Sequence, residues 1–475
     1  MWEKISETVM PILDGLDSFL YYPVLIIVLL AAGLFFSFKT KFVQVRLFKN
    51  SMKVIMERPG KDGSVSSFQA LMVSTASRVG TGNIVGVATA ICLGGPGAVF
   101  WMWLIAIIGG ASAFTESTLA QIYKRKDSNG DSYGGPAYYI ETALKNRGLA
   151  VLFAVALILT YAGGFNMLAS YNLQSTFAVF NFYDKNVTSW MIGGIFAVLV
   201  GYCVMGGGKR IVLVTEKVVP LMGVIYVIVS LIVIVMHLNL LPSVLGLIFE
   251  NAFQFNSAAG GIAGSAMMYG IKRGLYSNEA GVGSAPNAAA SADVSHPVKQ
   301  GLVQMLSVYI DTLLLCTATA FMCLFSGIGI DPELAGAPYV QASLSNVFGP
   351  VGPIFLVVAM VLFAFTTLLG NLYYVDNCVK FILKKEPTQQ FNLVFRFICA
   401  LLIFVGAGLP MAAVWDIADI LMFVMCIINL PACVVLSKVA IDATKDYEKQ
   451  LKEGKNPVFK AKDIAMDESH VEFWK

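Results

Sequence analysis

Charged residues are scarce in this sequence of 475 residues, and histidine is scarcer still. Only 13% of the residues are charged and 57% are hydrophobic, whereas a soluble globular domain carries about 25% charged residues. This composition excludes an ordinary soluble protein and indicates a chain embedded in a lipid bilayer. The three histidines, His237, His296 and His470, are far apart, and the eight cysteines form no CxxC pair. We therefore expect no metalloenzyme site and interpret the cysteines as packing residues.

Long apolar runs recur along the whole chain. A transmembrane helix needs about 20 predominantly apolar residues, so the sequence predicts about eleven spans, uncertain by about one, with no soluble domain between them. Acidic residues precede the first run and no small-residue cleavage site follows it, which indicates a retained span and not a signal peptide. The clearest runs are 22–36, 99–114, 151–162, 190–204, 212–236, 354–369 and 393–405.

Basic residues cluster in alternate loops, and this pattern predicts the orientation. Loops rich in Lys and Arg stay on the cytoplasmic side of a membrane. The opposite loops carry only Lys4 and Lys185, so an odd number of spans, with the N-terminus outside and the C-terminus inside, satisfies every loop. The clusters lack a platform of stacking aromatic residues, which favours contact with anionic lipid over nucleic-acid binding. The predicted cytoplasmic clusters are 39–58, 124–147, 209–217, Lys272 and Arg273 with Lys299, 380–385 and the tail.

The order of the spans predicts an all-α, multi-pass membrane protein with four segments. Residues 1–65 hold one transmembrane helix and a basic amphipathic segment on the inner membrane surface. Residues 66–240 and 241–441 each hold five spans, and each set begins with a glycine-interrupted helix. Because five is odd, the second set enters the membrane from the opposite side, which gives an inverted repeat. Residues 442–475 form a charged cytoplasmic tail, expected to be partly helical and then disordered.

The first interrupted helix contains the segment RVGTGNIVG. Broken helices survive in hydrocarbon only where the freed backbone groups line a cavity or meet a ligand. The amides of Gly80, Thr81 and Gly82, at the start of a half-helix, suit a carboxylate. The carbonyls freed near Ala76 and Val79 are hard oxygen donors that suit Na⁺. Close helix packing through the small residues is the alternative interpretation.

The second interrupted helix contains the segment GIKRGLYSNEAGVGS. Ser277, Asn278 and Glu279 bring hydrogen-bond acceptors into the bundle, and these acceptors suit the ammonium group of an amino acid. An ionised glutamate is costly to bury, so Glu279 should have a partner or line water. The alternative is a helix end at the cytoplasmic surface, where Glu279 forms a solvated cluster with Lys272 and Arg273.

Thr366 and Thr367 lie side by side in the apolar run LVVAMVLFAFTTLLG. Their hydroxyls are suited to complete a Na⁺ shell with the carbonyls near Ala76. Threonines in helices also donate back to carbonyls of their own helix, and the sequence leaves both interpretations open.

Two further ionisable residues are placed near mid-membrane by counting from the inner ends of their helices. Arg78 lies at the first interruption and Asp311 in the run LSVYIDTLLLC. Ionisable groups at this depth mark ion pathways or pair with one another, and the candidate partners are Glu116 and Glu279. Gating and structural bracing remain equally open for these four residues.

Several of these motifs together resemble the sodium:alanine (alanine/glycine:cation) symporter family. They are RVGTGNIVGVATAI, GGPGAVFWMW, SNEAGVGSAPNAAA, HPVKQGLV and IDT, and they span most of the chain. The resemblance implies a leucine-transporter-type fold of ten core helices in an inverted 5+5 repeat, with one extra N-terminal helix. It also implies Na⁺-coupled, or sometimes H⁺-coupled, import of alanine or glycine, and some similar carriers take glutamine.

The resemblance also assigns roles to individual residues. Gly80, Thr81 and Gly82 would hold the carboxylate and Asn278 would contact the substrate. Na⁺ would be held by Ala76, Val79, Thr366 and Thr367. Family members commonly carry Gly-Trp where this chain has Gly370 and Asn371, and often Gln-x-Asn where it has Ser170 to Asn172. The missing indole predicts a wider pocket at Asn371, which makes alanine a less secure substrate.

The sequence therefore predicts a symporter for a small neutral amino acid and Na⁺ in a prokaryotic plasma membrane, with no cofactor and no obligate protein partner. An ion channel is the alternative from another class, but a filter is normally built symmetrically from several chains, whereas the two interruptions here differ. A membrane-embedded enzyme is disfavoured because no HExxH, paired intramembrane Asp or nucleophile with an adjacent base occurs.

Overall fold

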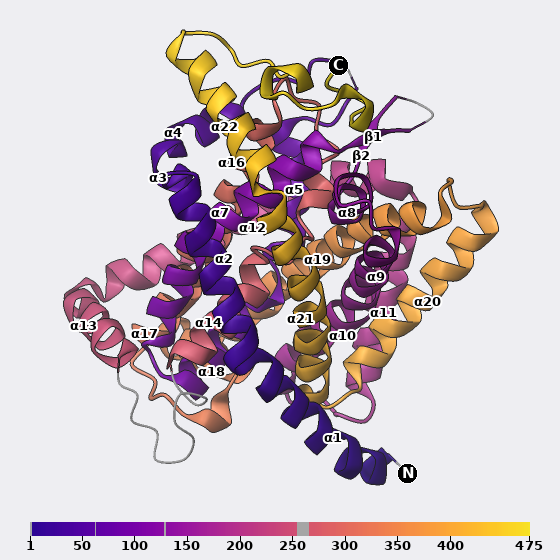
Figure 1. Ribbon diagram of the computed structural model, residues 1–475. Coiled ribbons are helices and arrows are strands. Elements are labelled where there is room, and N and C mark those ends of the chain that lie inside the picture. Colours follow the sequence, from indigo (N-terminus) through magenta and orange to yellow (C-terminus); the bar gives the residue numbers. More distant parts are fainter. Residues whose placement is uncertain (1, 62, 128–129, 254–265) are drawn as a thin grey trace.

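The structure, a computed structural model, describes residues 2–61, 63–127, 130–253 and 266–475. This part of the chain is almost wholly helical, apart from loops and the small hairpin of β1 (Arg125–Lys126) and β2 (Ser132–Tyr133). Most of the long helices run between two ends of the molecule (Figure 1). The N-terminal helix α1 (Trp2–Phe19) projects at one end, and the C-terminal tail covers the other, which we call the tail face. The all-α prediction is confirmed for the described residues.

Seven described helices are long and apolar enough to cross a membrane, and one bent pair makes an eighth candidate. The bent pair joins α5 (Ser67–Arg78) to the stretch Gly82–Gly94 at an angle of 53°. Three shorter apolar stretches, Ile26–Lys39, Thr188–Val204 and Leu238–Ala252, do not reach this length. Length and composition thus support a multi-pass membrane protein, with seven or eight spans among the described residues by this measure. The seven are α7 (Ala98–Ile122), Arg147–Val179, α12 (Gly207–Met236), Pro297–Leu324, α19 (Val351–Leu383), α20 (Gln389–Ala407) and α21 (Met411–Val435).

The other elements complete and connect these spans. The π-helical turns η3 (Leu159–Gly164) and η7 (Tyr309–Cys316) lie inside long spans and do not end them. The remaining α-helices are α2 (Ile26–Lys39), α3 (Val43–Arg46), α4 (Phe48–Val54), α6 (Val87–Gly94), α8 (Pro136–Ala143), α9 (Arg147–Ile158), α10 (Phe165–Ser175), α11 (Thr188–Val204), α13 (Leu241–Ala252), α14 (Ala266–Asn278), α15 (Pro286–Ala289), α16 (Pro297–Val308), α17 (Thr317–Leu324), α18 (Ala337–Phe348) and α22 (Ser437–Lys452). Short helical turns of other types are η1 (Leu20–Leu25), η2 (Gly82–Gly86), η4 (Thr176–Val179), η5 (Leu238–Leu240) and η8 (Pro332–Leu334).

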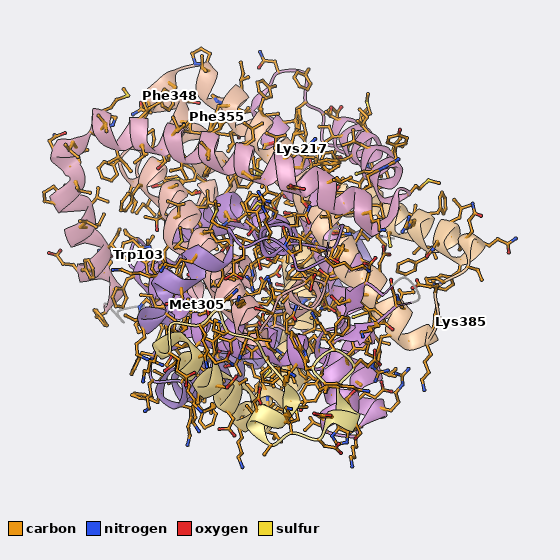
Figure 2. The ribbon with its side chains drawn as sticks, turned by 90° about the horizontal axis from the view of Figure 1, so that it is seen from above. Trp103, Lys217, Met305, Phe348, Phe355 and Lys385 are labelled. Carbon is orange, nitrogen blue, oxygen red and sulfur yellow. The ribbon has the colours of Figure 1, made fainter. Side chains whose placement is uncertain are left out.

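Two of the spans present apolar side chains to the outside of the molecule. Leu221, Val224 and Ile228 of α12 are all at least half exposed, as are Val394 and Phe397 of α20. An exposed apolar helix face is stable where lipid replaces water, so these helices are suited to the bilayer. The helix α19 has 33 residues, about 50 Å, and is longer than the roughly 30 Å hydrocarbon core. Lys384 and Lys385 follow its end, and Lys385 lies at the outer edge of the molecule in Figure 2.

The prediction that Lys272 and Arg273 lie in a cytoplasmic loop is wrong. Both residues lie within α14, where they are buried. The Lys272 ammonium is 3.0 Å from the Asp419 carboxylate of α21 and also contacts Asp17 of α1, while Arg273 Nη1 is 3.2 Å from Asp419. A buried cation is tolerated when it is paired in this way. The solvated cluster with Glu279 is likewise wrong, since Glu279 is 1% exposed.

The tail is more ordered than its charge predicted. It continues from α22 into two short 3₁₀ turns, Ala461–Ile464 and Glu468–His470. Trp474 is 6% exposed, and its indole Nε1 donates to the carbonyl of Gln121 at the end of α7 over 2.8 Å. The amide of Phe459 donates to the carbonyl of Ser295 over 2.9 Å. Buried aromatic residues thus hold the tail against the helix ends, and the predicted disorder is wrong.

Candidate functional site

The first interruption begins where α5 ends at Arg78. The helix starts with a capping box, because Ser66 Oγ accepts from the Gln69 amide and the Ser66 amide donates to Gln69 Oε1. Val79 then leaves the helical region with φ −76° and ψ 84°, and π-helical structure resumes at Gly82. The predicted interruption at Gly80 is therefore present in the fold.

The second interruption begins where α14 ends at Asn278. Glu279, Gly281 and Gly283 take positive φ values of 53°, 88° and 89°, and helical structure resumes only in the short α15 from Pro286. Positive φ is readily adopted by glycine but strained for glutamate, so the contacts of Glu279 must hold it there. Strained backbone of this kind is concentrated at functional sites.

The two interruptions lie directly against each other. A Cβ atom added to Gly82 would lie 2.5 Å from the Tyr276 ring of α14. One added to Gly80 would lie 2.1 Å from Thr367 Oγ1 of α19. Both distances are too short for any side chain, so glycine at these positions permits close approach as well as unwinding. These contacts support the packing interpretation for this segment, and the binding interpretation stays a prediction.

Two asparagines engage the polar groups of the first interruption. The Gly80 amide donates to Asn83 Oδ1 over 2.8 Å, and Asn172 Nδ2 of α10 donates to Thr81 Oγ1 over 3.0 Å. The predicted carboxylate-binding amide of Gly80 is thus already partnered in this structure. Sequence reasoning does not single out Asn83; an asparagine three residues after a helix-breaking glycine is the local signal for this contact.

The two threonines of α19 differ in what they face. Thr366 Oγ1 donates to the carbonyls of Leu362 and Phe363 in its own helix, over 3.0 and 3.1 Å. Thr367 Oγ1 lies beside Gly80 and has no hydrogen-bond partner among the described residues, although it is buried. The structure therefore brings Thr367, and not the Thr366 hydroxyl, to the first interruption, where Ala76 and Val79 are fully buried.

Asn371 lies one turn further along α19 and connects three helices. Its Oδ1 accepts from Ser77 Oγ of α5 over 2.7 Å, and its Nδ2 donates to Asn166 Oδ1 of α10 over 2.9 Å. Asn278 Oδ1 caps the broken end of α14 by accepting from the Ala280 amide.

Several buried polar atoms near these residues lack partners among the described residues. Buried polar atoms are nearly always hydrogen-bonded, so a group of exceptions at two facing interruptions indicates a place for a ligand or water. These atoms are Thr367 Oγ1, Asn278 Nδ2, Asn166 Nδ2, Asn172 Oδ1 and Ser170 Oγ.

The predicted ionisable residues are all buried, but no ion pair within 4.0 Å joins any of them in the described structure. Arg78 Nη1 donates to the backbone carbonyl and to Oε1 of Gln304 on α16. Glu279 accepts hydrogen bonds from Ser77 and Ser284, over 3.2 and 2.6 Å.

Glu116 of α7 contacts the second interruption from the other side. It accepts from the Gly281 amide over 3.3 Å and from Asn429 Nδ2 over 2.7 Å. The two glutamates are therefore held by neutral donors on either side of the break, and they fix its backbone.

Asp311 in η7 joins the two interruptions. Its carboxylate accepts from Asn83 Nδ2 over 2.7 Å and from Ser277 Oγ over 2.8 Å. Thr312 Oγ1 also donates to it over 2.8 Å. Its partners come from the first interruption, from α14 and from its own turn, and sequence reasoning does not identify these contacts.

A vestibule lies on the tail-face side of the interruptions, and packed aromatic residues lie on the opposite side; the residues of the two interruptions are buried and do not line the vestibule. This vestibule of about 660 Å³ is lined by Tyr373 and Asn377 of α19, by Asn287 of α15 and by residues of the tail face, including Phe473. On the opposite side, Tyr276 packs against Phe165 and Trp415 with ring centroids 4.8 Å apart in each case. The Arg273 guanidinium lies 3.8 Å from the centre of the Trp415 ring.

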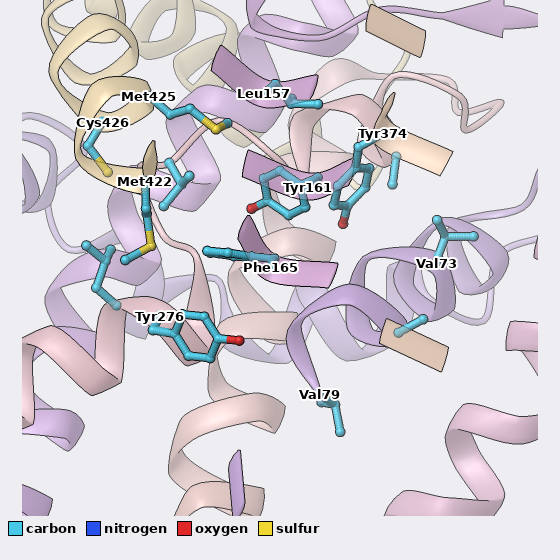
Figure 3. Packing of buried hydrophobic residues seen from close by; sticks show 14 of the residues in the cluster. Val73, Val79, Leu157, Tyr161, Phe165, Tyr276, Tyr374, Met422, Met425 and Cys426 are labelled. Carbon is cyan, nitrogen blue, oxygen red and sulfur yellow. The ribbon is translucent and has the colours of Figure 1, made fainter. Parts of the chain in front are cut away.

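Aromatic residues fill the space beside the interruptions. Figure 3 shows Phe165 between Tyr161 and Tyr276, with Tyr374 next to Tyr161. The ring centroids of Tyr161 and Tyr374 are 5.5 Å apart, and those of Tyr161 and Phe165 are 4.9 Å apart. These rings therefore pack as one continuous aromatic wall beside the two interruptions.

Comparison with known proteins agrees with this architecture. A model of the sodium:alanine symporter family matches residues 6–461. The probable sodium/glutamine symporter GlnT of Bacillus subtilis (strain 168) is 45% identical, over 99% of this chain and 97% of that protein. The amino-acid carrier protein AlsT of the same organism is 41% identical over 95% and 94%. The sodium/alanine symporter AgcS of Methanococcus maripaludis is 35% identical over 94% and 99%.

Solved structures of membrane transporters share the fold at low identity. A Na⁺-coupled sialic acid symporter aligns with a TM-score of 0.50 over 92% of both chains at 11% identity. A manganese transporter of Eremococcus coleocola aligns with a TM-score of 0.52 over 84% of both chains at 12% identity. Because the family match and the relatives cover nearly its whole length, the chain belongs to the sodium:alanine symporter family.

Proposed function

We propose that the protein is a secondary active transporter that imports a small neutral amino acid together with Na⁺ by alternating access. The observation that carries this proposal is the contact between two interrupted helices, where several buried polar atoms lack partners among the described residues; a vestibule lies on the tail-face side of this contact. A carrier needs a central site that is reached from one side at a time. The family match supports coupling to Na⁺ and argues for transport and against catalysis.

We propose eleven spans in this fold. The seven long spans and the bent pair are joined by α2 with the helical turns before it, by α11 and by the interrupted α14, which brings the count to eleven. On this assignment α5 to α12 and α14 to α21 form two five-helix units, each starting with a broken helix. Contacts between α7 and α16 and between α11 and α20 pair the second and fourth helices of the two units, as an inverted repeat does.

The substrate would lie between the two interruptions. We propose that its carboxylate meets the backbone at Gly80, Thr81 and Gly82, and that binding displaces Asn83 Oδ1 from the Gly80 amide. Asn278 Nδ2, which has no partner among the described residues, would meet the substrate from α14. Asn371 would face the substrate side chain together with Asn166.

The coupling ion would lie beside the first interruption. We propose that the carbonyls of Ala76 and Val79 and the hydroxyl of Thr367 hold Na⁺, since these are oxygen donors and Thr367 Oγ1 lacks a partner among the described residues. Thr366 would join this shell only if its hydroxyl turned away from the carbonyls that it now contacts. Na⁺ is cargo in this scheme, and the proposal includes no other cofactor.

Two kinds of substrate side chain are candidates. Alanine and glycine fit the family, but a polar wall of Asn371 and Asn166 suits the carboxamide of glutamine, and the relative at 45% identity is named as a probable sodium/glutamine symporter. Glutamine is therefore the second candidate substrate. Coupling to H⁺ is the alternative to Na⁺, since one relative at 42% identity is named as a putative sodium/proton-dependent alanine carrier.

We propose that the tail face lies in the cytoplasm and that α1 begins outside. The end of α2 at Lys39 and the end of α19 both reach this face, and both are basic; the tail that covers the face (Figure 1) is rich in lysine but balanced by acidic residues. Cytoplasmic ends of spans carry an excess of Lys and Arg. The open vestibule would then be the cytoplasmic exit, and the membrane would be the plasma membrane of a prokaryote.

Uptake into proteoliposomes tests the proposal. Labelled alanine and labelled glutamine are offered with an inward Na⁺ gradient, with an inward H⁺ gradient, or with neither. Saturable uptake that requires a cation gradient supports a carrier, and Na⁺ should raise substrate affinity. Uptake that does not saturate would indicate a channel and contradict the proposal.

A further inference from the structure

A second cavity on the tail face lies outside the transport site. It has a volume of about 230 Å³ and contains five basic residues and a single acidic one. The other lining residues are aromatic. The lining residues are Arg125, Tyr133, Tyr138, Glu141, Arg147, Lys380, Phe381, Lys384 and Lys385.

The two arginines are held in fixed positions. Glu141 of α8 accepts from both, through Oε2 from Arg125 Nη2 over 3.1 Å and through Oε1 from Arg147 Nη1 over 2.9 Å. Arg147 Nη2 also donates to the carbonyls of Phe381 and Ile382 at the end of α19, over 3.2 and 3.4 Å. Both guanidinium groups are therefore positioned before any ligand arrives, which lowers the entropy cost of binding.

The cavity has more positive charge than the protein neutralises. Arg125 and Arg147 share one carboxylate, and Lys380 pairs with Glu386. Lys384 and Lys385 are exposed and form no ion pair within 4.0 Å in the described structure. Five basic side chains therefore face two carboxylates, and clustered like charges are stabilised when an anion binds between them.

The cavity also lies where two spans leave the membrane. Arg147 is the first residue of the span Arg147–Val179, and Lys384 directly follows the last residue of the span Val351–Leu383. Lys385 reaches the outer edge of the molecule (Figure 2), where lipid headgroups would surround the chain. A phosphodiester at this depth could be contacted by guanidinium and ammonium groups together.

We propose that this cavity binds a phosphoryl anion, supplied by an anionic phospholipid headgroup or by free phosphate. Arginine binds phosphate oxygens in bidentate fashion, and lysine adds charge without fixed direction. If these basic residues served only to orient the spans in the membrane, their number near the span ends would be sufficient. Two guanidinium groups fixed by one carboxylate in a cavity would then have no role.

Binding there has a structural route to transport. Tyr133 and Lys380 line this cavity and the vestibule, so an occupant would lie beside the exit path of the main site. The Lys380 ammonium lies 3.9 Å from the centre of the Tyr133 ring. An anion that draws Lys380 away from this ring would change the wall of the vestibule.

The purified full-length protein provides the test. Its thermal unfolding is measured in nanodiscs of phosphatidylcholine, with or without added phosphatidylglycerol, and in detergent with sodium phosphate or with sodium chloride at equal ionic strength. We expect phosphatidylglycerol to raise the unfolding temperature by several degrees, and native mass spectrometry should show a retained anionic lipid. The variant Lys384→Gln with Lys385→Gln should lose most of the shift and of the retained lipid.

The matched control is Lys39→Gln with Lys41→Gln. These two lysines are also exposed at the tail-face end of an apolar helix, and Lys41 and Lys384 share positive φ values of 54° and 56°. The control should keep the shift, and so should Lys384→Arg with Lys385→Arg.

The two ligand sources are distinguished by the detergent arm. Stabilisation by phosphate above that by chloride assigns free phosphate as a ligand, whereas stabilisation by phosphatidylglycerol alone assigns the lipid headgroup. Equal loss in the control variant, or no specific stabilisation in either arm, overturns the proposal. Because these readouts do not use transport, a failure here leaves the proposed function untouched.

Discussion

The side-chain amide of Asn83 donates to the carboxylate of Asp311 over 2.7 Å, and this hydrogen bond links the first interrupted helix to η7. The same carboxylate accepts from Ser277 on α14, so one buried group holds both broken helices. A fully satisfied buried network of this kind fixes geometry more strongly than its separate bonds suggest. If the two broken helices move in the transport cycle, Asp311 is the residue through which they remain in register.

Replacing Asp311 should therefore impair transport more than folding. In Asp311→Asn an amide group replaces one carboxylate oxygen, so at least one of its three donors loses its acceptor, at a cost of about 1–3 kcal/mol. We expect a loss of uptake of about tenfold or more, measured as the initial rate in proteoliposomes. Asp463→Asn, in the exposed tail, is the control and should behave as the wild type. Equal activity of the two variants would exclude this role.

The two adjacent threonines offer a matched pair for the Na⁺ site. Thr367→Val should raise the Na⁺ concentration needed for half-maximal uptake about tenfold, because it removes the free hydroxyl beside Gly80. Thr366→Val should change it little, since that hydroxyl already donates to its own helix. Uptake measured over a range of Na⁺ concentrations compares them. A larger effect at Thr366 would move the ion site away from Thr367.

The sequence predicts those features of the site whose causes lie within a few residues along the chain. The interruptions at Gly80 and after Asn278 follow from glycines and polar residues within a few positions, and sequence shows both. The sequence predicts a loop at Arg273 because its partner Asp419 is 146 positions away, and spacing along the chain carries no information about that pair. The hydrogen bond from Asn172 to Thr81 was missed for the same reason.

The tail shows that amino-acid composition alone does not predict whether a segment is ordered. Its many charges predicted disorder, but a few aromatic residues decide its structure: Phe459 and Trp474 are both less than 9% exposed. Each buried aromatic side chain contributes about 1.5–3 kcal/mol, which is enough to hold a short segment against a folded surface. Average charge cannot reveal such contacts, because they depend on the surface that the tail meets.

The ion pair between Arg273 and Asp419 should be important for stability. Asp419→Asn leaves Lys272 and Arg273 buried with only Asp17 to balance them, and breaking a buried pair costs about 3–5 kcal/mol. We expect a clear fall in the unfolding temperature of the purified protein. Glu448→Gln breaks the exposed pair with Arg46 and should cost about 0–1 kcal/mol. The idea fails if the two variants unfold at the same temperature.

Asn371 should influence which amino acid is carried. In Asn371→Trp the indole would fill space beside Ser77 and Asn166 and remove both hydrogen bonds of the amide. We expect the preference to move toward alanine and away from glutamine, by about tenfold, in competition uptake with both substrates. Asn371→Leu keeps the branched shape of asparagine without its polarity and is much smaller than tryptophan, so it separates the bulk of the indole from the loss of hydrogen bonding. An unchanged preference in both variants would place Asn371 outside the substrate site.

The docked tail should respond to pH through Lys124, which follows α7 outside the span. Burial lowers the pKa of Lys124 to about 7, while nearby Asp293 acts in the opposite direction, and the ammonium lies 5.0 Å from the centre of the Trp474 ring. If the tail leaves, Lys124 meets water and its pKa returns toward 10.5. At pH values between about 7 and 10.5 the undocked state binds more protons than the docked state. The equilibrium constant for docking should therefore rise with pH above about 7, by up to about tenfold per pH unit, and this increase should be absent below about pH 7.

Trp474 reports on this equilibrium. The difference in tryptophan emission between the wild type and Trp474→Phe, followed from about pH 6 to about pH 9, should show a more buried indole at the higher pH. Lys124→Met fills the same space without a charge, so its tail should stay docked over the whole range. If Lys124→Met shows the same pH dependence as the wild type, another group controls the tail; if the wild type shows none, Lys124 does not change its charge when the tail docks.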